Sequence, residues 1–517
     1  MKFRIKGTFL LCAILISYNA LASISPNDFG LKTAKNGEER FWALYKAHVS
    51  ALRTGSVVDY SRVGDIFITI PANASTIPLS TQTDFHGITI TVENTTHNFL
   101  LFSFINEAHD IYINQDDVDG DCFEKYPALC NGVKLLIVED KNPWVENRKG
   151  YDYGVIRKDI RMIVEGVAQN SNIMPYHDPQ TSKPECSFVI SDYNEKSIKN
   201  LRFIRTESSS FKTFLFEIVG QNNLILQHIS IKTPWNTGMY GDQIITVSDC
   251  ANVKFYDVEI DGTYSKKDHF GYGIGMNNVY NASFDHLKGN ANWGIFGNNN
   301  INVCNLENCE INRFDIHCYG RDVTLKACTL RDMMGQFSST FGSISYENCN
   351  FINYLPYLTE TSFNCYVPFT LVIKDCKMQI TSDDPLKNVV CYMGRLNAQV
   401  NQRPELNKKS WPNIIIDGFT IENKAGHDDI FLFYIEPRIK DKRPVEGISY
   451  IKIRDLDISS NMNFRICNKD VITSKNVNID IKQKRRSKAK IHESNFYPYS
   501  QIYGIPLFLL NIIKSII

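Results

Sequence analysis

From about residue 190 onward, apolar and polar positions alternate in short runs that repeat one phrase. Each phrase has a short alternating run, a polar turn and a second short run, as in NVKFYDVEIDG (252–262), SISYENCNFIN (343–353) and IIIDGFTIEN (414–423). Period-2 alternation predicts β-strands, and no segment here holds a long helical period. Self-similarity at an interval of tens of residues is the sequence signature of a solenoid. The pattern therefore predicts an all-β fold of stacked coils.

Four cysteines occupy one place in successive phrases, at intervals of 19, 21 and 27 residues: Cys309, Cys328, Cys349 and Cys376. Equivalent positions on stacked coils lie about 4.8 Å apart. We therefore expect a column of buried free thiols, which behave as small hydrophobic groups. Disulfides are the alternative, because exported proteins use them. Cys122 and Cys130 flank a polar loop and are the pair that could be bridged.

The segment before the coils predicts a capping helix. Asn36 precedes an acidic first turn, which is a helix-start signal for residues 38–52. The apolar positions of this segment are Phe41, Leu44, Tyr45, Val49 and Leu52. Such a helix would cover the open end of the first coil, where unpaired strand edges are otherwise exposed. Two strand-like runs follow at 66–70 and 88–92.

The N-terminus predicts export. Residues 1–22 combine a basic start, a short apolar run and the small-residue pattern Ala20-Leu21-Ala22, which together resemble a signal peptide. The apolar run is too short for a bilayer of about 30 Å, so we expect no transmembrane segment in the mature chain and a secreted or periplasmic location. The expected segments are a signal peptide (1–22), an N-terminal cap (23–65), a parallel β-helix (66–480), and a basic linker with an apolar tail (481–517).

Charge and aromatic content narrow the partners. The 56 basic and 56 acidic residues balance to a formal net charge of zero. Nucleic-acid binding normally leaves a basic face, so no nucleic-acid partner is expected. Aromatic residues make up 12% of the chain, which suits stacking on sugar rings and suits a strand-rich core equally well.

The order of features near the N-terminus resembles a known superfamily. Asp28-Phe29-Gly30 is followed by the helical segment, a strand ending at Pro71 and then the coils. This order resembles the pectate-lyase-like right-handed parallel β-helix proteins, which include polysaccharide lyases and glycoside hydrolases, over roughly residues 26–480. No single family is matched. The resemblance implies a right-handed parallel β-helix that acts on, or holds, an extracellular polysaccharide.

Candidate chemistry lies in residues 269–338, where three coils can be aligned on Gly275, Gly297 and Gly320. A glycine at a fixed place in each coil suggests a recurring bend. Alternation then places His317 and Tyr319 on the outer side, with Gly294 one coil earlier leaving space beside the imidazole.

This alignment predicts a metal-independent polysaccharide lyase that cleaves a uronic-acid polymer, such as a glycosaminoglycan, by β-elimination. His317 would act as the base, Tyr319 as the acid, and Arg321 with Asn292 would hold the carboxylate. The other candidate substrate-binding residues are Tyr272, Asn290, Asn298, Lys266, Lys267, His269 and Trp235. The alternatives are that His317 and Tyr319 are surface residues without a catalytic role, and that Arg321 forms a local ion pair with Asp322.

No cofactor is expected, although Asp117, Asp119 and Asp121 offer the oxygen ligands that calcium prefers. The glycine of that loop is one position away from its place in the EF-hand pattern, so a solvated turn is the alternative.

Two other functions remain open, a non-catalytic glycan-binding or cell-surface β-helix and a glycoside hydrolase. The polygalacturonase-like pattern is broken, because Gly238 stands where an aspartate would follow Asn236-Thr237, and the pair Asp383-Asp384 lies many coils away.

Overall fold

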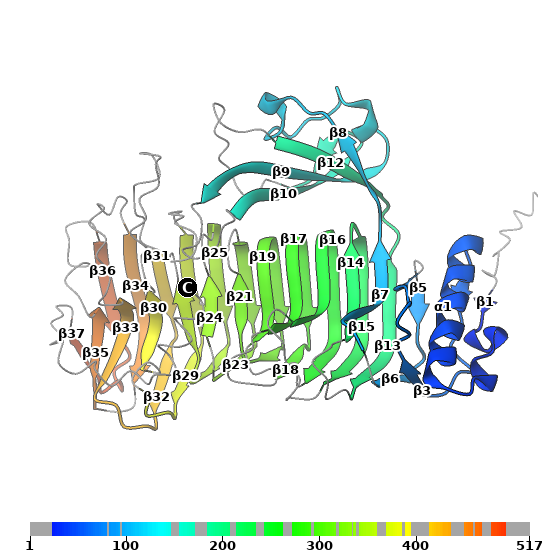
Figure 1. The fold of residues 1–517 in the computed structure, drawn as a ribbon. Coiled ribbons are helices and arrows are strands. Elements are labelled where there is room, and N and C mark those ends of the chain that lie inside the picture. Colours follow the sequence, from blue (N-terminus) through cyan, green and yellow to red (C-terminus); the bar gives the residue numbers. More distant parts are fainter. Residues whose placement is uncertain are drawn as a thin grey trace, which may run out of the picture.

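In this computed structural model, the residues placed well enough to describe lie in the following ranges: 23–79, 82–93, 96–145, 155–170, 184–206, 213–233, 242–261, 271–290, 294–316, 320–332, 334–337, 341–358, 369–384, 388–393, 413–435, 449–458, 461–467 and 477–492. In these ranges 30 strands form one continuous sheet, and each pairing of known register within it is parallel. Successive strands along the chain pair with strands one coil later, so the sheet winds into a solenoid (Figure 1). The predicted parallel β-helix is confirmed as a mostly β solenoid.

The elements before the inserted sheet, with their bounds, are β1 (Ser23–Ile24), η1 (Pro26–Phe29), η2 (Leu31–Thr33), α1 (Gly37–Thr54), β2 (Val57–Val58), β3 (Ile66–Thr69), β4 (Ile77–Pro78), β5 (Gln82–Asp84), β6 (Thr89–Glu93) and β7 (Phe99–Ile105). The inserted sheet and its turns comprise β8 (Ala108–Ile111), η3 (Gln115–Asp117), η4 (Pro127–Leu129), β9 (Val133–Val145), β10 (Val155–Val164), β11 (Val167–Ala168) and β12 (Pro184–Ser191).

The coils that follow begin with β13 (Lys196–Arg205), β14 (Thr213–Val219), β15 (Asn222–Lys232), β16 (Asp242–Asp261), β17 (Gly271–Asp285), β18 (Lys288–Asn290), β19 (Gly294–Glu307), β20 (Glu310–Ile311), β21 (Phe314–Ile316), β22 (Gly320–Lys326), β23 (Thr329–Arg331) and β24 (Met334–Phe337). They continue with β25 (Phe341–Glu347), β26 (Asn350–Ile352), β27 (Leu355–Leu358), β28 (Phe369–Lys374), β29 (Lys377–Ile380), β30 (Val389–Met393), β31 (Asn413–Asp417), β32 (Thr420–Asn423), β33 (Asp429–Ile435), β34 (Ser449–Ile458), β35 (Asn463–Cys467), β36 (Val477–Gln483) and β37 (Lys490–His492).

The helix predicted near the N-terminus is present as α1, packed against β3 and β4 at the end of the solenoid where the coils begin (Figure 1). Asn36 caps it, because its side-chain oxygen accepts the Glu39 backbone N–H at 2.8 Å. Phe41 and Leu44 are buried in the same core as the coils. Leu52 differs from the prediction, because it is 55% exposed and lies on the outer side of the last turn.

The repeated phrase is explained by a left-handed residue at the turn of each coil. In nine of the ten such turns among the described residues, this residue is asparagine, aspartate, histidine or glycine, the types that tolerate positive φ, and its φ is 55° at Asn308 and 51° at Asn348. The next residue in each coil points into the core, as with Cys309 and Cys349. The members of this turn column are Asn200, His228, Asp257, His286, Asn308, Ala327, Asn348, Asp375, Gly418 and Asp455.

The predicted column of free thiols is confirmed. Cys309, Cys328, Cys349 and Cys376 are each buried and unbridged. Each thiol donates to backbone carbonyls of its own and the preceding coil, as Cys328 Sγ does to Leu306 O at 3.6 Å. Cys122 and Cys130 are also unbridged.

An antiparallel sheet, which the sequence analysis did not predict, is inserted between β7 and β13. Its strand order is β11-β10-β9-β12-β8, and it lies beside the solenoid in Figure 1. Leu135, Ile137 and Ile160 pack with Ala251 of β16, so the sheet is attached through an apolar contact. Short apolar runs such as VKLLIV have the same pattern in either sheet, so periodicity does not indicate which partner a strand takes.

Candidate functional site

Several of the predicted site residues lie outside the described part of the chain: His317, Tyr319, Asn292, Lys266, Lys267, His269 and Trp235. Asn290 and Asn298 are described for their backbone alone, and Asn298 pairs with Met276 and Ile316, two buried core positions. Tyr272 and Arg321 are described with their side chains. The site is therefore built from the described residues around these two.

The register of the coils agrees with the prediction in one step and differs in the next. Gly275 pairs with Gly297, and Tyr272 pairs with Gly294, as expected. Gly297 then pairs with Asp315, however, and Gly320 pairs with Ile301. The step is 22 residues from 275 to 297 but 18 from 297 to 315, because Phe296 follows Gly289 by seven positions whereas their partners Phe314 and Ile311 are three positions apart. The coil is shortened at this corner, and the predicted alignment on Gly320 was wrong.

The shortened coil fills the space that was predicted beside Gly294. A Cβ atom at Gly294 would lie 2.8 Å from Cδ of Arg313. Phe314 and Ile316 are buried in the core, so alternation places Asp315 on the outer side of the wall, and Arg313 directly precedes this strand. Both are nevertheless fully buried. The side chain that lies beside Gly294 is thus that of Arg313.

Arg313, Asp315 and Tyr272 form a hydrogen-bonded cluster on the wall made by β17, β19 and β21. The Arg313 Nε–H donates to Asp315 Oδ2 at 2.6 Å. The Tyr272 hydroxyl donates to the same oxygen at 2.9 Å. A carboxylate that accepts from a buried guanidinium and a phenol is held in one orientation. The cluster therefore fixes the tyrosine ring on the wall.

The two glycines of this wall make room for flat side chains from the preceding coil. A Cβ atom at Gly297 would overlap the ring of Tyr272, and one at Gly275 would overlap the amide of Gln243. Gln243 and Tyr272 pair in register, so the amide and the ring lie side by side on adjacent coils. Both side chains are half-buried. We call Gln243 and Tyr272 the wall platform.

Arg321 lies in a different column from the cluster. It pairs with Asn302, and its Nε lies 3.4 Å from Asp322 Oδ2. Asp322 also accepts the Ser343 backbone N–H at 3.0 Å. The described contact of Arg321 is therefore the local ion pair that the sequence left open as an alternative.

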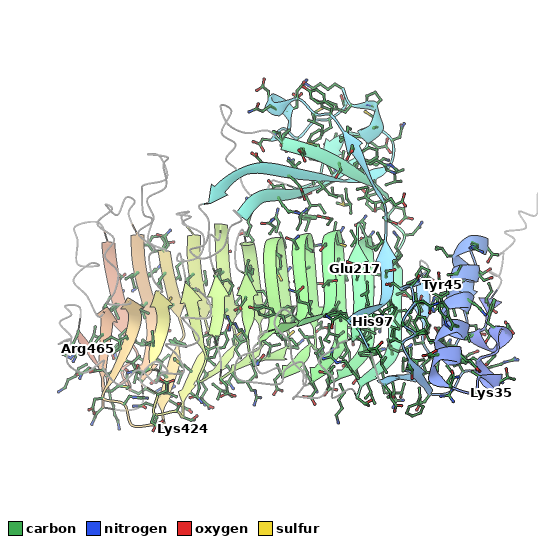
Figure 2. All side chains as sticks on the ribbon, in the orientation of Figure 1. Lys35, Tyr45, His97, Glu217, Lys424 and Arg465 are labelled. Carbon is green, nitrogen blue, oxygen red and sulfur yellow. The ribbon has the colours of Figure 1, made fainter. Side chains whose placement is uncertain are left out.

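A pair of hydrolytic carboxylates is not formed by the acids of this wall column. Glu217, labelled in Figure 2, pairs with Thr246, whose column continues through the two glycines to Asp315. Four coil steps at about 4.8 Å each separate the two carboxylates by roughly 19 Å. An inverting hydrolase needs roughly 6.5–9.5 Å and a retaining one about 5 Å.

The acidic loop that could have bound calcium has other partners. Asp117 contacts Lys125 and accepts from the Tyr126 hydroxyl at 2.5 Å, while Asp121 lies 2.7 Å from Arg161. Across the described ranges, His, Cys, Asp and Glu side chains form no group of three or more that could hold a metal ion. The same ranges contain no helix with the length and apolar character needed to cross a membrane.

Arg313 and Asp315 were missed by the sequence analysis. The signal that could have found them is the run Arg313-Phe314-Asp315, in which opposite charges flank a core phenylalanine at the start of a strand. Charges at i and i+2 of a strand point to the same side. Combined with glycines one coil earlier, that spacing indicates an ion pair on the wall.

No protein-family model matches the chain, and no curated protein matches it. Similar solved structures include the Gp54 tailspike of Acinetobacter baumannii bacteriophage AP22 in complex with A. baumannii capsular saccharide (10% identity, 88% of this chain and 79% of that chain, TM-score 0.48). The tailspike gp49 of Pseudomonas phage LKA1 is 12% identical over 90% of this chain and 84% of that chain, with a TM-score of 0.48. The Streptococcus pneumoniae surface adhesin PfbA is 8% identical over 93% and 96%, with a TM-score of 0.32. The fold assignment rests on the strand register itself.

Proposed function

We propose that the chain is an exported protein that binds an extracellular polysaccharide on the wall of β17, β19 and β21. The observation that supports this proposal is the wall platform. Tyr272 is half-buried, lies flat across Gly297 and is held at its hydroxyl by Asp315. A ring fixed before binding loses little freedom when a sugar stacks on it, and aromatic side chains offer large contact area with a polar edge. Gln243 adds amide groups that can bind sugar hydroxyls.

The specific reaction we propose for the bound polymer is β-elimination in a uronic-acid chain. His317 acts as base, Tyr319 as acid, and Arg321 with Asn292 binds the carboxylate, as the residue chemistry suggests. Lys266, Lys267 and His269 are the basic residues proposed to attract an anionic chain such as a glycosaminoglycan.

Binding without turnover is the second candidate, and one observation favours it. Asp315 is fully buried and already accepts from Arg313 and Tyr272, so this carboxylate is not available to act as an acid or base. The described part of the wall therefore supplies groups that position a ligand. The lyase candidate, in contrast, requires His317 and Tyr319 for its chemistry.

The proposal also includes roles for residues 1–22 and for α1. Residues 1–22 direct export, and α1 covers the first coil of a right-handed helix, the hand that parallel crossovers favour. Support for the covering role comes from Phe41, Leu44 and Ala47, which are buried in one core with the coils.

The test is an assay of the purified protein against uronate polymers. Product formation is followed by the absorbance of the unsaturated sugar, and binding is followed by calorimetry. Tyr272→Ala should weaken binding about tenfold or more, while Tyr272→Phe keeps the ring and should retain most of it. Tyr450→Ala removes another exposed tyrosine, 37% accessible, and is the matched control.

His317→Ala separates the two candidates. Loss of turnover with retained binding supports the lyase, and absence of turnover in the unmodified protein with retained binding supports the binding protein. If Tyr272→Ala binds as tightly as the unmodified chain, the wall platform is not the site.

A further inference from the structure

A second exposed surface runs along the turn column defined above, from Asn200 to Asp455. The positions just before the left-handed residues pair in register from coil to coil, and we call them the charged column. Its members in the described ranges are Lys199, Gln227, Tyr256, Asp285, Glu307, Lys326, Glu347, Lys374, Asp417 and Arg454, and Asp84 extends the column through its register with Lys199.

The charged column is built mainly of alternating charges that pair with one another. Lys199 lies 3.6 Å from Asp84, and Lys326 lies 2.8 Å from Glu307. Gln227 and Tyr256 are the two uncharged members. The ladder of charges is therefore interrupted on two adjacent coils, and an aromatic ring stands in the gap.

Two imidazoles flank this ring. The rings of His228 and Tyr256 have centroids 5.8 Å apart at 70°, and those of Tyr256 and His286 are 6.2 Å apart at 66°. Side-chain exposure is 44% for His228 and 54% for His286, and Tyr256 is 42% exposed. We call these three residues the aromatic stripe.

Hydrogen bonds fix the orientation of His228. Asn200 donates its amide N–H to Asp84 at 2.8 Å, so its oxygen is the acceptor for Nδ1 of His228 at 3.1 Å. The remaining nitrogen, Nε2, lies 3.4 Å from the Gln227 amide nitrogen and is an acceptor in the neutral ring.

His286 is fixed in the same way. Its Nδ1 lies 2.7 Å from Asp285 Oδ1, which also accepts the Asn308 amide N–H at 3.1 Å. Both imidazoles are thus oriented by neighbouring side chains, and both residues sit on left-handed turns followed by buried core residues.

We infer that the aromatic stripe is a second carbohydrate site, which takes a neutral oligosaccharide lying along the solenoid axis. An exposed ring between oriented nitrogen and amide groups matches the apolar face and the hydroxyls of a sugar. Asp257 and Asp285 border the stripe, so a polyanion is disfavoured here by like charge. Coils about 4.8 Å apart present one side chain per step, a length similar to that of one pyranose unit.

This inference rests on the proposed function for the general ligand class, carbohydrate, and differs from it in surface and in charge. The experiment uses the full chain with two sets of probes, cellohexaose, mannohexaose and maltohexaose as neutral ligands and hexagalacturonate as the anionic one. Binding is measured by calorimetry for the unmodified chain and for Tyr256→Ala, Tyr256→Phe, Tyr272→Ala and Tyr450→Ala.

We expect at least one neutral hexasaccharide to bind, with about tenfold weaker binding in Tyr256→Ala and a change below about threefold in Tyr256→Phe. Tyr450→Ala should leave neutral binding unchanged. The inference is overturned if no neutral probe binds, or if Tyr256→Ala binds them normally. Hexagalacturonate binding that depends on Tyr272 would leave the proposed function standing in either case.

Discussion

The protein contains two fully buried pairs of polar side chains, one charged and one uncharged. On the wall, Arg313 and Asp315 are fully buried and form an ion pair. On the buried side of α1, His48 Nε2 lies 2.7 Å from the Tyr60 hydroxyl, and both residues are also fully buried. Burial lowers the pKa of His48 from 6.5 to about 3 and raises the pKa of Tyr60 well above its usual range. This second pair is therefore uncharged at neutral pH.

The difference indicates what each pair is for. The uncharged pair lies among Phe85 and Phe102 and requires no counter-charge. A buried charge is costly to desolvate, and an ion pair is seldom the most stable filling for such a place. Retention of the charges beside a half-buried tyrosine is consistent with the orienting role proposed for the cluster.

The largest expected effect comes from removing one charge of the wall pair. Asp315→Asn keeps the shape of the side chain but removes the carboxylate charge that lies 2.6 Å from Nε of the buried Arg313 guanidinium. We expect a loss of roughly 3–5 kcal/mol in the free energy of unfolding, measured by urea denaturation. Adding Arg313→Met to this variant should restore most of the loss, because both charges are then gone. A single variant as stable as the unmodified chain would show that the pair is not buried as described.

Lowering the pH should reduce the stability of the protein through the His48–Tyr60 pair. The unfolded chain binds a proton at His48 below about pH 6.5, whereas the folded chain does so only near pH 3, so stability is fully present above pH 6.5 and decreases as the pH falls through this window. From pH 7 to pH 5 the loss attributable to His48 is about 2 kcal/mol. The measurement is the difference in urea midpoint between the unmodified chain and His48→Gln across this range. If the urea midpoints of the two proteins change in parallel with pH, His48 does not cause the loss of stability.

The hydroxyl of Tyr60 should contribute less. Tyr60→Phe removes the contact with His48 Nε2 and leaves that nitrogen without this partner in the core. A loss of about 1–2 kcal/mol is expected at pH 7, by thermal or urea unfolding. Phe85→Leu, a change of shape nearby without loss of a hydrogen bond, is the control for packing. A neutral result for Tyr60→Phe would indicate that the pair adds no net stability.

Much of the fold could be predicted because the same constraint recurs in every coil. A left-handed turn residue followed by a buried one produced the repeated phrase, and the thiol column followed from it. The helix from Gly37 to Thr54 was found from its cap and its apolar period. The inserted sheet was not found, because its strands carry no feature that distinguishes them from solenoid strands.

The site was harder to predict because it lies where the repeat breaks. The pairing of Gly275 with Gly297 followed the 22-residue step, but the corner before Phe314 is shorter and moved the next coil out of the predicted alignment. A repeat predicts regular positions and carries no information about a shortened corner. The register of Tyr272 with Gly294 was predicted correctly, while the groups that hold the tyrosine were missed.

The smallest effect on stability is expected for Asp322→Asn, which is the exposed counterpart of Asp315→Asn. Asp322→Asn makes the same chemical change as Asp315→Asn, but in an exposed pair, since the Asp322 side chain is 46% accessible and that of Arg321 is 32% accessible. Asparagine also tolerates the positive φ of 50° at this position and can still accept the Ser343 N–H. Exposed pairs contribute about 0–1 kcal/mol, so we expect a change in unfolding free energy below about 0.5 kcal/mol, by the same urea measurement. If the two substitutions cost the same, burial does not distinguish the wall pair from an ordinary surface pair, and the orienting role of Asp315 loses its physical basis.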